Sequence, residues 1–406
     1  MTERVIPAEG RDLRLFVVAG EHSGDVLGGR LMAALGQRRR GRIRYLGVGG
    51  PHMAAEGLVS QFPMEEVAVM GPAAVLARLP QLLQRIGQTA AAAIAAQADA
   101  VLIIDSPEFT HPIARRIRRR APSIPIIDYV SPSVWAWRPG RARRMRTYVD
   151  HVLALLPFEP AAHRRLQGPP CTYVGHPLVE RLPWMATLDP QALARRLNLA
   201  PDLPVLVVLP GSRTSEVKRL MRPFGDAVAR LLQQGRRLEI VLPVVSSVRA
   251  LVEAALPAWP QRPHLVESEE DKFSAFKLAR VALAASGTVS LELAAAGTPM
   301  VVGYKVDPLL AAPLRLLVTI DTAILANLVL GERAFPEFLQ GKCTPVNLAG
   351  ALGPLLDGGP ARDGQMAALA RIPDKLRIEK GSPSEAAADI VLHYAEHGRV
   401  WPHPAF

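Results

Sequence analysis

Two short segments of the chain combine glycine with hydroxyl or basic residues in a way that suits anion binding. Each follows an apolar run and opens a helical pattern; they are Gly211-Ser212-Arg213 and Ser286-Gly287-Thr288. The first amides of a helix lack partners and carry partial positive charge, and arginine can make two hydrogen bonds with one phosphate. If the preceding strands are neighbours, both segments meet at one diphosphate. Glu292, about one turn after Thr288, is placed to bind a ribose diol. An ordinary helix N-cap is the alternative for each segment.

A carboxylate at the end of another apolar run is a candidate general base. Asp105 closes the run AVLIID at 100–105 and precedes Pro107. Burial there can raise a carboxylate's affinity for a proton, and a positioned carboxylate can accept the proton of a substrate hydroxyl. Glu108 and His111 lie close by as rival bases. A capping aspartate at a strand–helix turn is the alternative.

The segment GEHSGD at 20–25 follows the first apolar run and contains Glu21 and Ser23. It lacks the G-x-G-x-x-G spacing, and no acidic residue ends the next strand, so dinucleotide binding is not supported. The two side chains either cap a helix or belong to a substrate-binding loop. Further along, Trp135 and Trp137 follow a strand and are either core residues or part of a ligand-binding wall.

The positions of these motifs depend on strands that alternate with helices, a pattern typical of parallel sheets with helices on both faces. The sequence predicts an α/β fold of two doubly wound, Rossmann-like domains facing a cleft, with ligands at the carboxyl ends of the strands. The expected strands are 13–19, 43–48, 100–105, 124–130, 151–156, 204–210, 238–244, 280–285 and 300–304. The predicted divisions are an N-terminal domain at 1–180, a linker at 181–203, a C-terminal domain at 204–360 and a helical segment at 361–406. We expect the last segment to pack on the N-terminal domain or on a partner subunit.

The formal charge of +11 indicates an anionic partner. No nucleic-acid-binding motif accompanies the arginines and aromatic residues are few, so an anionic lipid surface or a phosphorylated substrate is favoured over nucleic acid. The N-terminus lacks a signal pattern, and the most apolar long stretch, 90–104, is interrupted by Gln97 and Asp99. Two cysteines fit a reducing cytosol. There is no Asp-x-Asp motif, and we expect neither a metal nor a cofactor.

Taken in order along the chain, many segments resemble one family. They include AGEHSGD, GVGGPHMAAEG, MEEVAVMG, IDSPEF, YVSPSVWAWR, LALLPFE, YVGHPL, LPGSR, ASGTVSLE and PMVVGY. The family is that of the lipid-A-disaccharide synthases, inverting glycosyltransferases with the two-domain GT-B fold. They join UDP-2,3-diacylglucosamine to 2,3-diacylglucosamine 1-phosphate (lipid X), forming a β-1,6-linked disaccharide and UDP.

The resemblance implies roles for individual residues. Asp105 is implied as the general base and Arg213 as the group that stabilises the departing UDP, while the SGT segment and Glu292 hold diphosphate and ribose. Asn327 lies in ANLVLGER, which resembles a further family motif with a displaced arginine, Arg333. Glu108 and Thr110 stand where the family usually has aspartate and asparagine, so the resemblance assigns them no role.

The stretch 64–85 has an apolar, arginine-flanked pattern that suits membrane docking or acyl-chain binding. The predicted contacts are Val67, Val69, Met70, Val75 and Leu76; an ordinary core helix is the alternative. The expected location is the cytoplasm, peripherally on the cytoplasmic face of the inner membrane, and a homodimer is a further expectation. Two other functions remain open: another GT-B enzyme that uses UDP-N-acetylglucosamine, as an epimerase or a transferase to a different lipid, and a nucleic-acid-binding protein.

Overall fold

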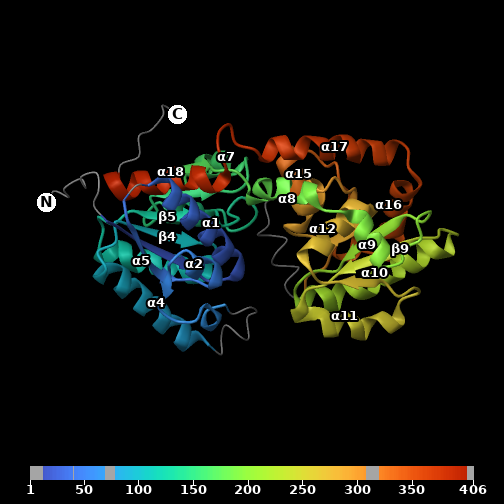
Figure 1. Cartoon of the computed structure of the whole chain (residues 1–406), viewed down its shortest axis with the longest axis horizontal. Helices are drawn as coiled ribbons and strands as arrows, with labels where there is room; N and C mark the ends of the chain where they lie inside the picture. The colour runs from blue at the N-terminus through green and yellow to red at the C-terminus, as the bar shows by residue number, and fades with distance from the viewer. Residues whose placement is uncertain (1–11, 40, 69–77, 308–319, 400–406) are drawn as a thin grey trace. The chain divides into compact units, whose positions relative to one another are not determined.

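The computed structural model describes residues 12–39, 41–68, 78–307 and 320–399. The chain folds into two compact units (Figure 1). The first comprises Met1–Pro177 and Ile378–Phe406, and the second comprises Leu178–Arg377. Each unit has its own parallel sheet, so the predicted pair of doubly wound α/β domains is confirmed.

The first unit is built on a sheet of seven described strands in the order β3-β2-β1-β4-β5-β6-β7. The strands are β1 (Leu13–Ala19), β2 (Ile43–Val48), β3 (Val59–Ser60), β4 (Ala100–Ile104), β5 (Ile126–Tyr129), β6 (His151–Ala154) and β7 (Cys171–Tyr173). Pairing is parallel throughout these described strands, and β1 lies between β2 and β4. The central strands are near-continuous apolar runs because helices cover both of their faces.

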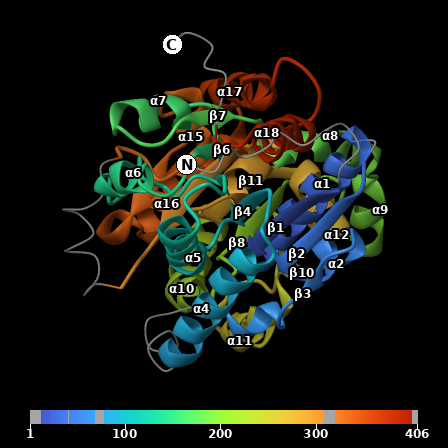
Figure 2. The same cartoon turned by 90° about the vertical axis from the view of Figure 1, so that its left-hand side faces the viewer.

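Helices enclose this sheet in two apolar layers. They are α1 (His22–Arg38), α2 (Pro51–Ala55), α4 (Leu79–Ala95), α5 (Pro107–Arg120), α6 (Gly140–Met145), α7 (Glu159–Arg165) and α18 (Pro383–His397). One core cluster joins the sheet to α1, α2 and α18, and the other joins it to α4, α5 and α6 (Figure 2). The carboxyl ends of β1 and β4 therefore lie between helices of both layers, where the polar segments of the sequence begin.

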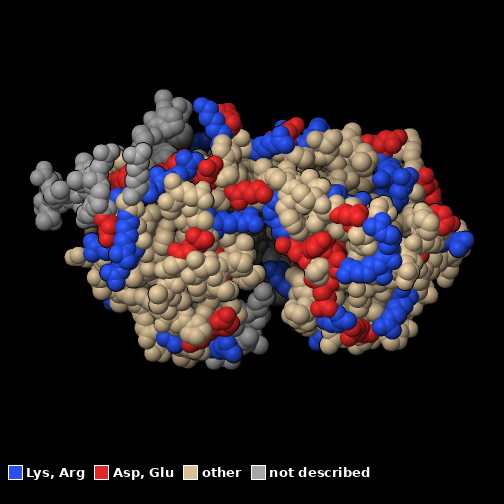
Figure 3. Space-filling model, in the orientation of Figure 1, with Lys and Arg blue, Asp and Glu red and all other residues tan. Residues whose placement is uncertain are grey.

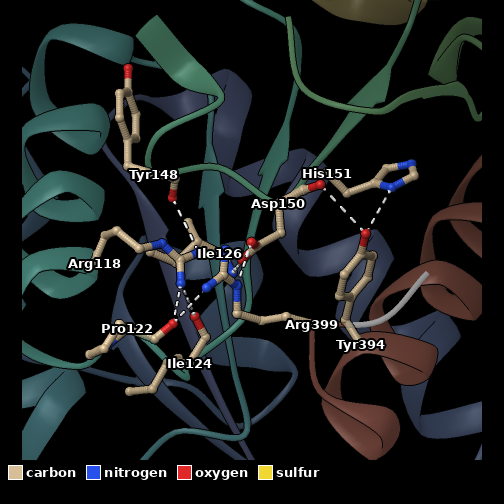
Figure 4. A network of polar contacts seen from close by, with 9 residues as sticks. All are labelled: Arg118, Pro122, Ile124, Ile126, Tyr148, Asp150, His151, Tyr394 and Arg399. Carbon is tan, nitrogen blue, oxygen red and sulfur yellow. Dashed lines mark hydrogen bonds and ion pairs between the residues drawn. The ribbon is translucent and has the colours of Figure 1, made fainter.

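The C-terminal helix α18 is tied to the first unit by a polar network at the amino ends of β5 and β6 (Figure 4). The buried Asp150 carboxylate accepts hydrogen bonds from Arg118 and, at 2.7 Å, from Nε of Arg399. The Tyr394 hydroxyl lies 3.2 Å from Nδ1 of His151. Residues more than two hundred positions apart are thus held together, and α18 is part of the first unit.

The second unit contains six described strands in the order β10-β9-β8-β11-β12-β13, all parallel. The strands are β8 (Val205–Leu209), β9 (Glu239–Pro243), β10 (His264–Val266), β11 (Ala279–Ala285), β12 (Met300–Tyr304) and β13 (Glu337–Leu339). The helices are α8 (Leu182–Thr187), α9 (Pro190–Arg196), α10 (Thr214–Gln233), α11 (Arg249–Ala255), α12 (Glu269–Leu278), α13 (Val289–Ala295), α15 (Leu325–Leu330), α16 (Pro345–Asp357) and α17 (Pro360–Leu376). Neighbouring strands β8 and β11 bring their carboxyl ends together, as the anion-site prediction requires.

The segment 181–203 differs from the expected linker. It forms α8 and α9 within the second unit, where Met185 and Leu193 are buried and Lys277 Nζ donates to the Met185 carbonyl at 3.0 Å. Pro183 and Pro190 do not mark an irregular connection, because each lies in the first turn of its helix. A backbone N–H in the first turn has no acceptor within the helix, so proline is tolerated there.

The segment 361–406 is likewise divided rather than continuous. Helix α17 packs with α13, α15 and α16 in the second unit, whereas α18 packs with α1 in the first. Both helices are amphipathic, and their sequence pattern does not indicate which sheet each one covers.

Charged side chains are distributed over the surface. On the face shown in Figure 3, lysine and arginine are interspersed with aspartate and glutamate on both units. Many arginines of the described residues form ion pairs, including Arg38, Arg85, Arg141, Arg181, Arg219 and Arg236. None of the described helices is both long and apolar enough to span a membrane.

Candidate active site

Asp105 lies immediately after β4 in a strained turn. Its φ is 53° and that of Ser106 is 44°, so two consecutive non-glycine residues adopt the left-handed conformation. Such residues persist only where the surrounding structure holds them, and they cluster at functional sites. The buried Thr110 hydroxyl donates to the Asp105 carbonyl at 2.8 Å and so fixes the turn to the first turn of α5. The strain is compatible with a catalytic position.

Each oxygen of the Asp105 carboxylate accepts one hydrogen bond. Oδ1 accepts from the Ser106 amide at 2.8 Å, and Oδ2 accepts from Oγ of Ser23 at 2.9 Å. Ser23 is exposed in the first turn of α1, next to the half-buried N-cap residue Glu21. The structure therefore brings Ser23 to Asp105, while Glu21 has no side-chain hydrogen bond to its helix.

The two rival bases differ in accessibility. Glu108 is exposed and pairs with Arg141 at 2.5 Å; burial works to raise the Glu108 pKa, but the hydrogen bond and charge of Arg141 outweigh it and lower the pKa. His111 is 1% exposed, with Nδ1 2.9 Å from the Tyr148 hydroxyl and Nε2 3.3 Å from Oδ2 of Asp128. His111 is thus enclosed by protein groups, and Glu108 is the accessible rival.

Trp135 belongs to the core of the first unit. It is 8% exposed, and its Nε1 donates to Oε1 of Glu159 at 3.0 Å. Oε2 of Glu159 accepts from the amides of Leu155 and Leu156 at 3.1 and 2.9 Å. Burial raises the pKa of Glu159 to about 7, although these hydrogen bonds lower it. This buried carboxyl group joins two of the sequence motifs, YVSPSVWAWR and LALLPFE.

In the second unit, the two predicted segments converge on one pocket of about 520 Å³. Its lining includes Gly211, Ser212, Arg213, Ser286, Gly287, Thr288 and Glu292, together with Glu216, Glu267 and Lys272. The volume falls in the range of small-molecule sites, roughly 300–1,000 Å³. The convergence follows from the parallel pairing of β8 with β11, which ends both strands at the same edge.

The polar groups of this pocket are partly engaged with one another. Oγ of Ser286 donates to the Ala323 carbonyl at 2.7 Å. Both carboxylate oxygens of Glu292 accept from Nζ of Lys272, at 3.1 and 3.0 Å. Lys272 adds a positive charge that the sequence motifs did not indicate, because it lies in a separate helix, α12, with no recognisable signal.

The segment Gly211-Ser212-Arg213 does not present its amides as expected. Glu216, three residues after Arg213, accepts the amides of Ser212 and Arg213 through Oε2, at 3.2 and 3.3 Å. Glu216 is buried, at 7% exposure. Glutamate at the third helical position supplies one half of a capping box, but the N-cap residue is Arg213 rather than serine or threonine, so the sequence does not show the complete signal.

Asn327 is not among the residues that line this pocket, and its role in substrate binding stays a prediction. Its side chain is 1% exposed and connects Thr322 with Phe335. Nδ2 donates to the Phe335 carbonyl at 2.9 Å and to the Thr322 hydroxyl at 3.3 Å, and Oδ1 accepts from the Phe335 amide at 3.0 Å. Asparagine is required here to hold backbone groups, a role that the motif alone does not reveal.

The predicted membrane contacts fall into two groups. Val69, Met70, Val75 and Leu76 lie outside the described residues. Val67 is 6% exposed and packs in the core cluster with α4 and α5, so for this residue the core alternative is correct.

One group of side chains in the described part of the chain brings potential metal ligands close together. Ligand atoms of His22, Asp25 and His52 lie within 4.8 Å of one another. The Asp25 carboxylate is buried and accepts the amides of Gly50, His52 and Met53 at 2.8 to 3.1 Å. Asp25 therefore caps α2, and the histidines remain the exposed members of the group.

Comparison with known proteins decides the family. A model described as lipid-A-disaccharide synthetase matches residues 15–391. The chain belongs to this family. Lipid-A-disaccharide synthases of Nitrobacter hamburgensis and Rhodopseudomonas palustris are 52% and 53% identical to it over 379 and 380 residues, and each alignment covers 93% of this chain and 95% of the relative. The chain is a glycosyltransferase of lipid A biosynthesis that forms the lipid A disaccharide.

The fold agrees with that of GT-B enzymes. A UDP-GlcNAc 2-epimerase from Neisseria meningitidis, solved with UDP-GlcNAc bound, superposes with a TM-score of 0.64 over 94% of this chain and 98% of the epimerase. The sequence identity is 12%, so this likeness concerns the fold alone. The family assignment does not favour the alternative of another UDP-N-acetylglucosamine enzyme.

Proposed function

We propose that the chain transfers the sugar of UDP-2,3-diacylglucosamine to the 6-hydroxyl of 2,3-diacylglucosamine 1-phosphate. The products are the β-1,6-linked disaccharide 1-phosphate and UDP. The observation that carries this proposal is the pocket of the second unit, where glycine, hydroxyl and basic residues from β8 and β11 surround a volume suited to a nucleotide.

In the proposed mechanism, Asp105 accepts the proton of the acceptor 6-hydroxyl. The oxygen of that hydroxyl bonds to the anomeric carbon of the UDP-sugar. The bond from that carbon to the β-phosphate oxygen breaks, and its electron pair leaves with UDP. Attack from the face opposite the leaving group inverts the anomeric centre. Arg213 stabilises the charge that develops on the diphosphate, since a guanidinium matches two phosphate oxygens. Glu292 binds the ribose diol through carboxylate oxygens that Lys272 already orients.

Several features support a peripheral site of action on the cytoplasmic face of the inner membrane. Both substrates carry acyl chains, so the reacting hydroxyl is presented at a lipid–water boundary. In the first turns of α4, directly after residues 69–77, Leu79 is 39% and Leu83 is 49% exposed. The net charge of +11 favours anionic headgroups. A homodimer remains a prediction.

The test is direct. Purified protein is incubated with both acylated substrates, and UDP and disaccharide are measured by chromatography and mass spectrometry. Stoichiometric release of both supports the proposal. Turnover of UDP-N-acetylglucosamine itself, with epimerisation or transfer to another lipid and no disaccharide from the acylated pair, would refute it.

A further inference from the structure

Glu216 occupies the concave face of the segment that was expected to bind phosphate. It is the third residue of α10, and Oε2 receives the amides of Ser212 and Arg213. Gly211 has a φ of 109°, and a Cβ added there would lie 2.4 Å from the same oxygen. Glycine is therefore needed at this position both for the backbone conformation and for the close approach of the carboxylate.

The other oxygen of this carboxylate contacts two side chains. Oε1 lies 3.4 Å from Nη1 of Arg213 and accepts from the Tyr304 hydroxyl at 3.4 Å. Tyr304 is the last residue of β12. Burial raises the pKa of its hydroxyl, and the negative charge of Glu216 raises it further. The carboxylate thus joins the LPGSR and PMVVGY motifs at the wall of the pocket.

This arrangement changes which group of the segment can bind a diphosphate. Each amide has one hydrogen, and the amides of Ser212 and Arg213 direct theirs to Glu216. The guanidinium has five N–H donors, and its side chain is 59% exposed. Two backbone amides of the segment are therefore engaged, and its charged donor for a phosphate is the Arg213 side chain.

Glu216 is itself unsuited to contact the ligand. A carboxylate and a diphosphate repel one another at short range, and no intervening cation other than Arg213 contacts Glu216 in the described structure. The contact of its Oε1 with Nη1 of Arg213, at 3.4 Å, limits the directions that the long arginine side chain can take. Such restriction removes conformational freedom that ligand binding would otherwise have to remove.

We infer that Glu216 is the positioning residue for Arg213: its carboxylate engages the backbone of the segment and aims the guanidinium at the diphosphate. The inference rests on the proposed function, because it requires that UDP binds in this pocket. Glu216 acts through Arg213 and touches no substrate.

A double-mutant cycle tests this role. Glu216→Gln, Arg213→Ala and the double variant are compared with the wild type by kcat, KM for the UDP-sugar and calorimetric Kd for UDP. The loss of a hydrogen bond to a charged group predicts that Glu216→Gln lowers kcat/KM by about 10- to 100-fold. In the Arg213→Ala background the same change should have little further effect, because the guanidinium that it positions is gone.

Two controls distinguish the loss of Arg213 positioning from the loss of a negative charge in the pocket and from the loss of folding. Glu267→Gln removes the same charge from the same pocket; Glu267 pairs with Arg249 and not with Arg213, so its effect should be equal in both Arg213 backgrounds. Thermal unfolding is followed for every variant. Should Glu216→Gln not fold, Glu216→Asp replaces it in the cycle, since it keeps the charge but shortens the reach to the guanidinium.

The outcomes distinguish the inference from the proposed function. An equal loss from Glu216→Gln with and without Arg213 would show a structural cap and overturn the inference. Wild-type protein that neither binds UDP nor forms disaccharide would instead refute the function. The expected result is that Glu216→Gln lowers kcat/KM only in the protein that retains Arg213.

Discussion

Oγ of Ser23 lies 2.9 Å from Oδ2 of Asp105, joining the first turn of α1 to the strained turn after β4. The contact depends on the pairing of β1 with β4, which places Ala19 beside Ile104 at the ends of the two strands. With the Ser106 amide on Oδ1, each carboxylate oxygen has one protein donor and retains a lone pair. The carboxylate is oriented and can still accept a proton from a substrate.

Asp105→Asn should bind UDP as the wild type does but lose turnover by roughly 10²- to 10⁴-fold, the usual contribution of a general base. Rates of disaccharide formation and calorimetric UDP affinity measure the two effects separately. Glu108→Gln is the matched control, because Glu108 is the exposed carboxylate in the first turn of α5, just after Asp105. Full activity in the Asp105 variant with loss in the Glu108 variant would transfer the role to Glu108.

Ser23→Ala should reduce kcat by about threefold to tenfold, since it removes one hydrogen bond that orients the base. KM for the UDP-sugar should not change, because Ser23 contacts Asp105 in the first unit. Ser23→Thr retains the hydroxyl and is expected to restore part of the rate. A KM effect without a kcat effect would instead indicate that Ser23 contacts the substrate.

Arg213→Ala should weaken UDP binding and slow transfer. Arg213→Lys should recover only part of the loss, because an ammonium cannot match two phosphate oxygens with a planar fork. UDP affinity and single-turnover rates test both variants. Wild-type affinity and rate in Arg213→Ala would show that this guanidinium, 59% exposed, is a surface group without a ligand.

The strand positions were predictable for the inner strands of each sheet. The runs 13–19, 43–48 and 300–304 match β1, β2 and β12 residue for residue. The described strands that sequence reasoning missed are β3, β7, β10 and β13, and each lies at an edge of its sheet. Edge strands here have two or three residues, too few to show a periodic pattern, and only one neighbour determines them.

The site residues were predictable by location but less so by role. Strand ends indicated Asp105, Arg213 and the SGT segment, and parallel pairing brings the last two to one pocket. Motif position alone did not show that the Asn327 amide holds the backbone of Phe335. Contacts such as those of Glu216 depend on side-chain direction and on distant segments, which spacing does not specify.

Removal of divalent ions should leave activity intact. The cations that line the pocket among the described residues are Arg213 and Lys272. Activity is measured after dialysis against EDTA and after addition of Mg²⁺ or Mn²⁺. A clear loss that these ions restore would reveal a metal requirement. His52→Ala then shows whether the group of His22, Asp25 and His52 is responsible.

Glu159 should make stability depend on pH. Its pKa is raised from 4.5 to about 7 in the fold, so the folded state favours the protonated form. The stabilisation is complete below the unfolded value and is lost as pH rises from about 4.5 through about 7. Relative to the wild type, Glu159→Gln should therefore gain stability progressively across this range.

Urea unfolding of both proteins at several pH values measures that difference. Glutamine has a single acceptor oxygen, so the variant cannot accept from both Trp135 and the Leu155 and Leu156 amides. This loss gives an offset that does not depend on pH, so the slope is the informative quantity. Burial lowers the pKa of His163 to about 4, which acts in the opposite sense: its stabilisation is present above 6.5 and lost on acidification. It is common to both proteins and cancels. A difference that does not vary with pH would mean that Glu159 titrates normally.

Membrane binding should require both charge and apolar contact. Headgroup attraction is screened over about 8 Å at physiological salt, so binding to phosphatidylglycerol vesicles should weaken as salt rises and be weaker still on phosphatidylcholine. Replacing Val69 and Met70 with Asp should weaken binding more than salt does. Leu83→Asp should add to this loss, because that side chain is 49% exposed. Val67 is excluded from the set because a charge at that buried position would disrupt the core.

Vesicle co-sedimentation, with circular dichroism to verify folding, measures these effects. Val346→Asp is the matched control: its side chain is 56% exposed on α16 of the second unit, so it removes a comparable apolar group from another surface. Equal loss in the control would point to a general effect of added charge. If the Val69 and Met70 variant sediments with vesicles at low and high salt alike, residues 64–85 are not the membrane contact. If it unfolds, these two residues are core residues like Val67, and the contact lies elsewhere.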